Sequence, residues 1–120
     1  MAETRPDRPR HRQRDRQSSF SDFAIPTPIV ELLAAEGVTS PFPIQEKTLP
    51  DALAGRDILG RGRTGSGKTL GFVLPLVTRL SVSRTRTKSK SPRAIILAPT
   101  RELANQIHET LAPLAAQVGL

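Results

Sequence analysis

The chain has 120 residues and a formal net charge of +7, from 18 lysines and arginines against 11 aspartates and glutamates. This length limits it to one domain. The absence of cysteine excludes a disulfide-stapled secreted module and a cysteine-based zinc site. No apolar run approaches the ~18 residues of a membrane span, and no secretory signal follows the basic N-terminus. We therefore expect a soluble, cytoplasmic protein with no membrane contact, and the basic surplus suggests a polyanionic partner.

The positive charge lies in two segments, and the remainder of the chain carries a net charge of −1. Residues 1–19 hold six arginines against three acidic residues and almost no large apolar side chain. They cannot offset the entropy cost of ordering, which predicts a disordered basic tail. Residues 81–93 hold five basic residues and no acidic one, and 81–92 read as an exposed loop. For both segments, plain solvation and weak contact with a phosphate backbone stay open as alternatives.

Helices are predicted from apolar residues at helical spacing and from start and stop signals. Thr27 is the expected cap of the first helix and Gly37 its stop. Pro50 is expected to divide the second helix into two short turns, and Pro75 to bend the third, because a helix interior tolerates proline poorly. The predicted helices cover about residues 28–36, 44–54, 68–80 and 101–119.

Strands are predicted at residues 57–59 and 94–98, which are short apolar runs. The second run is continuous, as in a strand covered on both faces. Strands that alternate with helices indicate an α/β fold with a parallel sheet and flanking helices. Only the first two strands are present, whereas a doubly wound sheet has about five or more, so the sequence resembles the start of a domain.

A glycine-rich loop lies between the first predicted strand and the third predicted helix. Residues 62–69 match the pattern G-x-x-x-x-G-K-[ST] in full. Gly65 and Gly67 permit the backbone angles that turn successive N–H groups toward a phosphate, at the positive end of the next helix. Lys68 supplies a charge to the phosphates and the Thr69 hydroxyl a ligand for Mg²⁺. The alternative is a chance match, which the flanking strand and helix argue against.

Two further stretches resemble motifs of the DEAD-box ATP-dependent RNA helicases, and specifically of the bacterial type. Residues 37–45, Gly-Val-Thr-Ser-Pro-Phe-Pro-Ile-Gln, resemble the Q motif, and Phe20 stands 17 residues ahead, where the family has an isolated aromatic. Residues 64–69 resemble motif I, and residues 99–104, Pro-Thr-Arg-Glu-Leu-Ala, resemble motif Ia. Residues 20–120 are thus identified as the N-terminal part of a RecA-like ATP-binding domain, after the tail at residues 1–19.

The resemblance implies that the chain binds ATP with Mg²⁺ and contacts RNA. Gln45 should read the adenine edge, since its amide both donates and accepts hydrogen bonds, and Phe20 should lie against the adenine ring. Lys68 and Thr69 are the implied catalytic residues, and Thr69 the implied metal ligand. The implied ATP-binding set is Phe20, Gln45, Thr64, Gly65, Ser66, Gly67, Lys68 and Thr69. The implied RNA-binding set is Pro99, Thr100, Arg101 and Glu102.

RNA contact should run through phosphate and sugar, without sequence preference, because the chain has no Tyr or Trp for base stacking. Nothing in the sequence points to an oligomer. The chain departs from the family pattern at Gly62, at Arg63 and at Phe42, which stands where Thr is commoner. The Phe42 choice has no explanation in the sequence.

No D-E-A-D or S-A-T motif follows, and no aspartate occurs after Asp57, so we expect these 120 residues to lack ATPase activity. The sequence is interpreted as the N-terminal portion of an ATP-dependent RNA helicase. The alternative is a truncated, non-catalytic nucleotide- or RNA-binding fragment. A P-loop NTPase unrelated to helicases is a third possibility, against which Gln45 and residues 99–104 argue.

Overall fold

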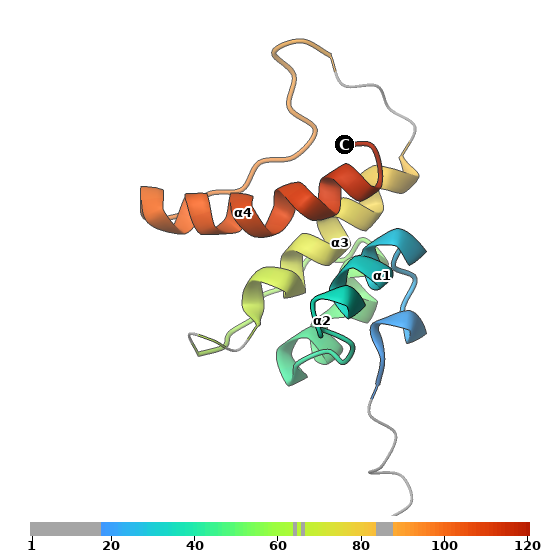
Figure 1. Ribbon diagram of the computed structural model, residues 1–120. Helices are drawn as coiled ribbons and strands as arrows, with labels where there is room; N and C mark the ends of the chain where they lie inside the picture. Colours follow the sequence, from blue (N-terminus) through green and yellow to red (C-terminus); the bar gives the residue numbers. More distant parts are fainter. Residues whose placement is uncertain (1–17, 64, 66, 84–87) are drawn as a thin grey trace, which may run out of the picture.

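The computed structural model describes residues 18–63, 65, 67–83 and 88–120. These residues form a short 3-10 turn and four α-helices (Figure 1). The turn is η2 (Phe20–Asp22), and the helices are α1 (Thr27–Ala35), α2 (Pro43–Leu53), α3 (Lys68–Val82) and α4 (Arg101–Gln117). The four predicted helices are confirmed, each to within a few residues at its ends.

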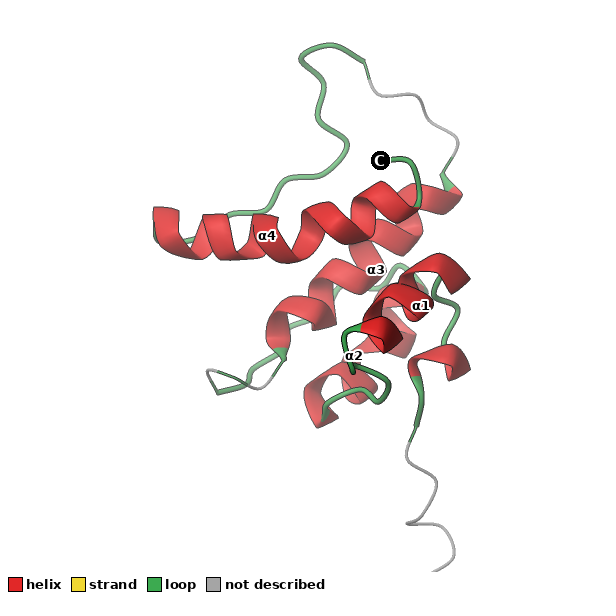
Figure 2. Ribbon diagram, viewed as in Figure 1, coloured by secondary structure: helices red, strands yellow, loops and turns green. Residues whose placement is uncertain are grey.

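The predicted α/β class is wrong for the part of the chain that the structure describes. That part contains no strand, as Figure 2 shows, and its one β-bridge joins Lys88 to Ser91. Residues 57–59 and 94–98 are loops that exchange no backbone hydrogen bond with each other among the described residues. Leu59 is 85% exposed and Leu97 is 90% exposed, although both were expected in a buried sheet.

The physical reason for this error is that a strand exists only through its neighbours. A helix closes its backbone hydrogen bonds within its own segment, whereas the bonds of a strand must go to a second strand. An apolar run of strand length therefore predicts a strand only where a partner lies beside it. Ile96 and Ala98 are partly buried and pack against the helical core. Ile95 and Leu97, which alternate with them along the chain, are exposed.

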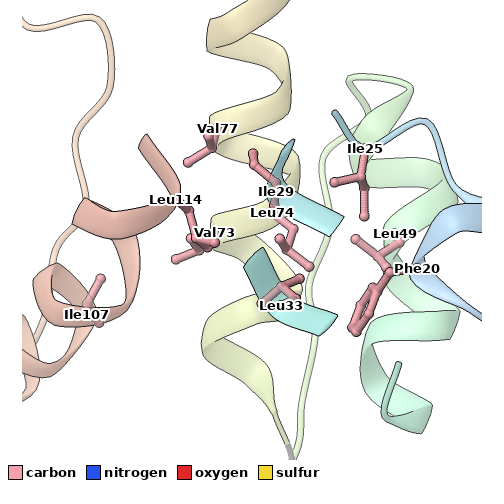
Figure 3. Packing of buried hydrophobic residues seen from close by; sticks show 10 residues of the cluster. All are labelled: Phe20, Ile25, Ile29, Leu33, Leu49, Val73, Leu74, Val77, Ile107 and Leu114. Carbon is pink, nitrogen blue, oxygen red and sulfur yellow. The ribbon is translucent and has the colours of Figure 1, made fainter. Parts of the chain in front are cut away.

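Helix α3 is the centre of the fold. It packs against α2 and against α4, while α1 contacts α4 and η2. Figure 1 shows α4 on one side of α3 and the two shorter helices on the other. Six side chains of the core are completely or almost completely buried, and Figure 3 shows them meeting between the helices. They are Phe20, Ile29, Leu49, Val73, Leu74 and Val77.

Proline interrupts the helices less than predicted. Pro50 was expected to divide α2, but α2 is continuous from Pro43 to Leu53 with Pro50 inside it. Pro50 has no N–H to donate to the carbonyl one turn earlier. Because Pro50 is exposed, water can hydrate that carbonyl instead. Thr48 also lies in this stretch, and its hydroxyl donates to the Ile44 carbonyl at 2.7 Å. Pro75 lies inside α3 and is buried.

The two basic segments are described only in part. Residues 1–17 and 84–87 lie outside the described residues, and Ser81 and Val82 are the last two residues of α3 rather than loop. Ser19 caps η2 and donates its backbone N–H to the Asp22 carboxylate at 2.9 Å. Arg93 donates to the Leu80 carbonyl at 3.0 Å and thus caps the end of α3. None of the helices in the described ranges is long and apolar enough to cross a membrane.

Candidate functional site

The glycine loop leads directly into α3. Gly65 and Gly67 both have positive φ, +80° and +84°, in the left-handed region that favours glycine. Gly67 is the N-cap of α3, and no side chain among the described residues caps this end of the helix. Within those residues the first backbone N–H groups of α3 lack a side-chain acceptor and, with the positive end of the helix dipole, favour an anion. Thr64 and Ser66 of the predicted set lie outside the described residues.

Lys68 and Thr69 are the first two residues of α3, as the predicted phosphate site requires. Lys68 is exposed and Thr69 is half-buried. An exposed ammonium group beside the first N–H groups of the helix adds a full positive charge to the partial charge of the helix end. The Thr69 hydroxyl is an oxygen ligand of the kind that Mg²⁺ prefers. The described residues contain no group of three His, Cys, Asp or Glu side chains that could hold a metal by themselves.

Gln45 joins the start of α2 to the start of α3. Its side chain is 2% exposed and both ends of its amide are used. Oε1 accepts from the Phe42 backbone N–H at 2.9 Å, and Nε2 donates to the Gly67 carbonyl at 2.8 Å. The same carbonyl accepts the N–H of Gly71 at 3.2 Å, the first hydrogen bond of α3. Gln45 thereby fixes the position of the last loop glycine.

Phe42 lies against the same glycine, and sequence reasoning assigned it no role. A Cβ added to Gly67 would lie 2.5 Å from Phe42 Cδ2 and would also overlap the Gln45 amide. The residue is nevertheless 53% exposed. Phe42 is the N-cap of α2, a position where Ser, Thr, Asp or Asn is preferred for its acceptor oxygen. That mismatch was the one signal in the sequence that could have pointed to Phe42.

Phe20 lies in the core rather than at the glycine loop. Its side chain is completely buried and lies near Leu49 and Leu33 (Figure 3). Its backbone N–H donates to the Thr39 carbonyl at 3.2 Å, which holds η2 against the segment that leads into α2. The contact of Phe20 with an adenine ring stays a prediction.

The predicted RNA-binding residues form the start of α4. Thr100 is the N-cap, and its Oγ1 accepts from the Leu103 N–H at 3.2 Å. Pro99, Arg101 and Glu102 are exposed, and Arg101 makes no ion pair within the described ranges. Helices α3 and α4 pack together, and both begin on the left of Figure 1. The phosphate loop and the start of α4 thus lie toward the same end of this helix pair.

Replacing Gln45 with glutamate is expected to lower the free energy of unfolding at pH 7 by about 1–3 kcal/mol. A carboxylate cannot donate to the Gly67 carbonyl, and burial there raises the pKa of the new carboxyl above its usual ~4.3. The folded chain then holds the proton more tightly than the unfolded chain. The loss of stability is therefore small below ~pH 4 and grows as the pH rises through the raised pKa.

Urea unfolding of Gln45→Glu and wild type over a series of pH values measures this effect. Gln45→Met is the matched control, because it removes both hydrogen bonds without adding a charge and should be destabilised equally at every pH. A constant difference between Gln45→Glu and wild type would contradict the tight burial of this amide.

Comparison with known proteins identifies the family. A model of the DEAD/DEAH box helicases matches residues 42–120, more than half of the chain. The chain is 47% identical to the ATP-dependent RNA helicase RhlB of Sodalis glossinidius, over 87% of this chain and 26% of that protein. It is 45% identical to the ATP-dependent RNA helicase DDX50 of Mus musculus, over 88% of this chain and 14% of that protein.

A solved structure is also similar. The RNA helicase Prp28 of Chaetomium thermophilum, in a crystal structure with bound ADP, matches with a TM-score of 0.73 and 38% identity. The match covers 88% of this chain and 25% of that chain. The chain therefore belongs to the DEAD-box RNA helicase family, which confirms the resemblance seen in the sequence. It spans about a quarter or less of the length of these relatives.

Proposed function

We propose that this chain is the N-terminal portion of an ATP-dependent RNA helicase and that it binds ATP with Mg²⁺ at the start of α3. The observation that carries the proposal is the left-handed pair Gly65 and Gly67 before a helix start that no described side chain caps, with Lys68 exposed beside it. This arrangement suits a chain of phosphates, because N–H donors and a positive charge converge on one spot. Family membership supports the assignment.

The residues of the site have separate roles in this proposal. Lys68 places its charge on the terminal phosphates, and the Thr69 hydroxyl would hold Mg²⁺, which neutralises phosphate charge when bound. Gln45 has a second amide hydrogen and one further lone pair on its oxygen, so it can receive an adenine edge while its present bonds remain. Its contact with the Gly67 carbonyl holds the loop in place for the phosphates.

RNA contact is proposed for the start of α4. Thr100 accepts a hydrogen bond from its own helix, which leaves the hydroxyl hydrogen free to donate to a phosphate. Arg101 is exposed beside it. Backbone contacts of this type carry no sequence information, so binding should not depend on the RNA sequence. A cytoplasmic location is part of the proposal.

The test is the binding of ATP with Mg²⁺ by residues 1–120, measured by isothermal titration calorimetry. We expect weak binding by wild type and none by Lys68→Ala, because the variant loses the charge that faces the phosphates. Lys47→Ala is the matched control, since Lys47 is an exposed lysine on α2 outside the site. Equal binding by wild type and Lys68→Ala would refute the phosphate site. The same chain should show no Lys68-dependent ATP hydrolysis.

A further inference from the structure

We propose that Phe42 is a base-contacting residue of this site, and that the exposed part of its ring packs against the purine base of the bound nucleotide. The inference rests on the proposed phosphate site at the start of α3. It assigns the base to the side of the loop where α2 begins, next to Gln45.

Phe42 lies directly beside the phosphate loop. Cδ2 of Phe42 fills the space beside Gly67 in which a side chain would otherwise lie, so the ring stands at the end of the phosphate loop. The backbone N–H of Phe42 is bound by the Gln45 side chain at 2.9 Å, and this side chain binds Gly67 in turn. The ring is therefore attached to the loop through two contacts, yet about half of its surface stays open.

Phe42 also departs from the usual preference for a helix N-cap. The N-cap of a helix favours a side chain that accepts a hydrogen bond, and Phe has no acceptor. In a capping box, the side chains at the N-cap and three residues later each accept from the other's backbone N–H. Here only the Gln45 side chain does so, because it accepts from the Phe42 N–H. Positions at which a sequence departs from local preference are often functional or strained sites. An exposed aromatic ring at this position is such a departure.

The other phenylalanines lie farther from the loop or are buried. The chain has four, and it has no other aromatic residue besides its histidines. Phe20 is completely buried, and Phe23 is half-buried and packs against the core. Phe72 is exposed, but it lies one turn into α3 past Lys68, whereas Phe42 touches the loop. Phe42 is thus the aromatic ring best placed for a base.

The chemistry of the pair Phe42 and Gln45 matches a base. A ring face gives stacking that every base accepts, and an amide gives hydrogen bonds to one base edge. Removal of one stacking contact typically weakens binding by about tenfold or more. The phosphates should not be affected, because they lie on the backbone N–H groups and Lys68.

The experiment compares two probes, ATP with Mg²⁺ and inorganic tripolyphosphate with Mg²⁺, on the full chain. Phe42→Thr should weaken ATP binding about tenfold and leave tripolyphosphate binding unchanged. Its melting temperature should equal or exceed that of wild type, because Thr can cap α2. Phe72→Leu is the matched control at another exposed phenylalanine and should change neither affinity.

Each other outcome is informative. Equal weakening of both probes by Phe42→Thr would mean that the ring only positions Gly67, and would overturn the base contact. Unchanged binding of both probes would also overturn it. If wild type binds neither probe, or if Lys68→Ala binds both as well as wild type does, the proposed phosphate site itself fails.

Discussion

Replacing Leu74 with alanine is expected to lower the free energy of unfolding by about 2–5 kcal/mol, whereas Leu59→Ala should change it by less than about 0.5 kcal/mol. Leu74 is completely buried in α3, where the other helices meet, so truncation leaves a cavity. Leu59 has the same side chain but lies in an exposed loop, and its truncation removes little buried surface. The two substitutions are chemically identical, so their difference measures burial alone.

Urea unfolding followed by far-ultraviolet circular dichroism measures both variants on the full chain. The midpoint should fall strongly for Leu74→Ala and hardly at all for Leu59→Ala, with similar slopes for all three proteins. This pair also tests the corrected fold. A cost at Leu59 comparable to that at Leu74 would mean that residues 57–59 are buried, as a strand would be, and would contradict the helical arrangement.

Gly67→Ala is expected to lower the free energy of unfolding by about 2–4 kcal/mol and to abolish binding of ATP with Mg²⁺. Part of the cost is backbone strain, because φ is +84°. The remainder is steric, since the new Cβ would overlap Phe42 and Gln45. Either side chain must move, and the loop moves with it.

Gly37→Ala is the control that separates these two costs. Gly37 has φ +81°, but a Cβ there would meet no atom within 4 Å. Its replacement should cost only the strain of about 1–2 kcal/mol and leave nucleotide binding unchanged. Urea unfolding and calorimetric titration of both variants give the comparison. Equal destabilisation by the two substitutions would show that Phe42 and Gln45 do not press on Gly67.

The helices could be predicted because their signals are local. Apolar spacing and Gly37 placed the helix ends within a few residues, and Gly37 has the positive φ of a helix stop. The first helix begins at Thr27 itself, with Pro26 as the cap, so the predicted cap was wrong by one residue. The division at Pro50 was also wrong, because an exposed proline leaves its unpaired carbonyl open to water.

The strands could not be predicted reliably, because their existence depends on residues elsewhere in the chain. The run at 94–98 has the composition of a covered strand, but only Ile96 and Ala98 pack toward the core. Burial on both faces requires neighbours that a local pattern does not contain.

The position of the glycine loop was predictable from the sequence, but its contacts were not. The glycine loop, Lys68 and Thr69 follow from a pattern of eight consecutive residues, and the structure places them at the start of α3 as expected. The bond from Gln45 to Gly67 joins residues 22 positions apart and depends on how α2 packs on α3. Phe42 was left without a role for the same reason, since its closeness to Gly67 also depends on how α2 packs on α3.

The bond between Arg93 and the end of α3 has a consequence for engineering the chain. It fastens the connection between α3 and α4 to the end of α3 at Arg93. Residues 88–92 precede this fixed point, and residues 94–100 lead from it to α4. Extra residues in the first part lengthen a loop whose ends stay fixed, which costs little. Residues 88–92 are therefore the place for an inserted tag or fluorophore, whereas insertion after Arg93 would change how far α4 can reach.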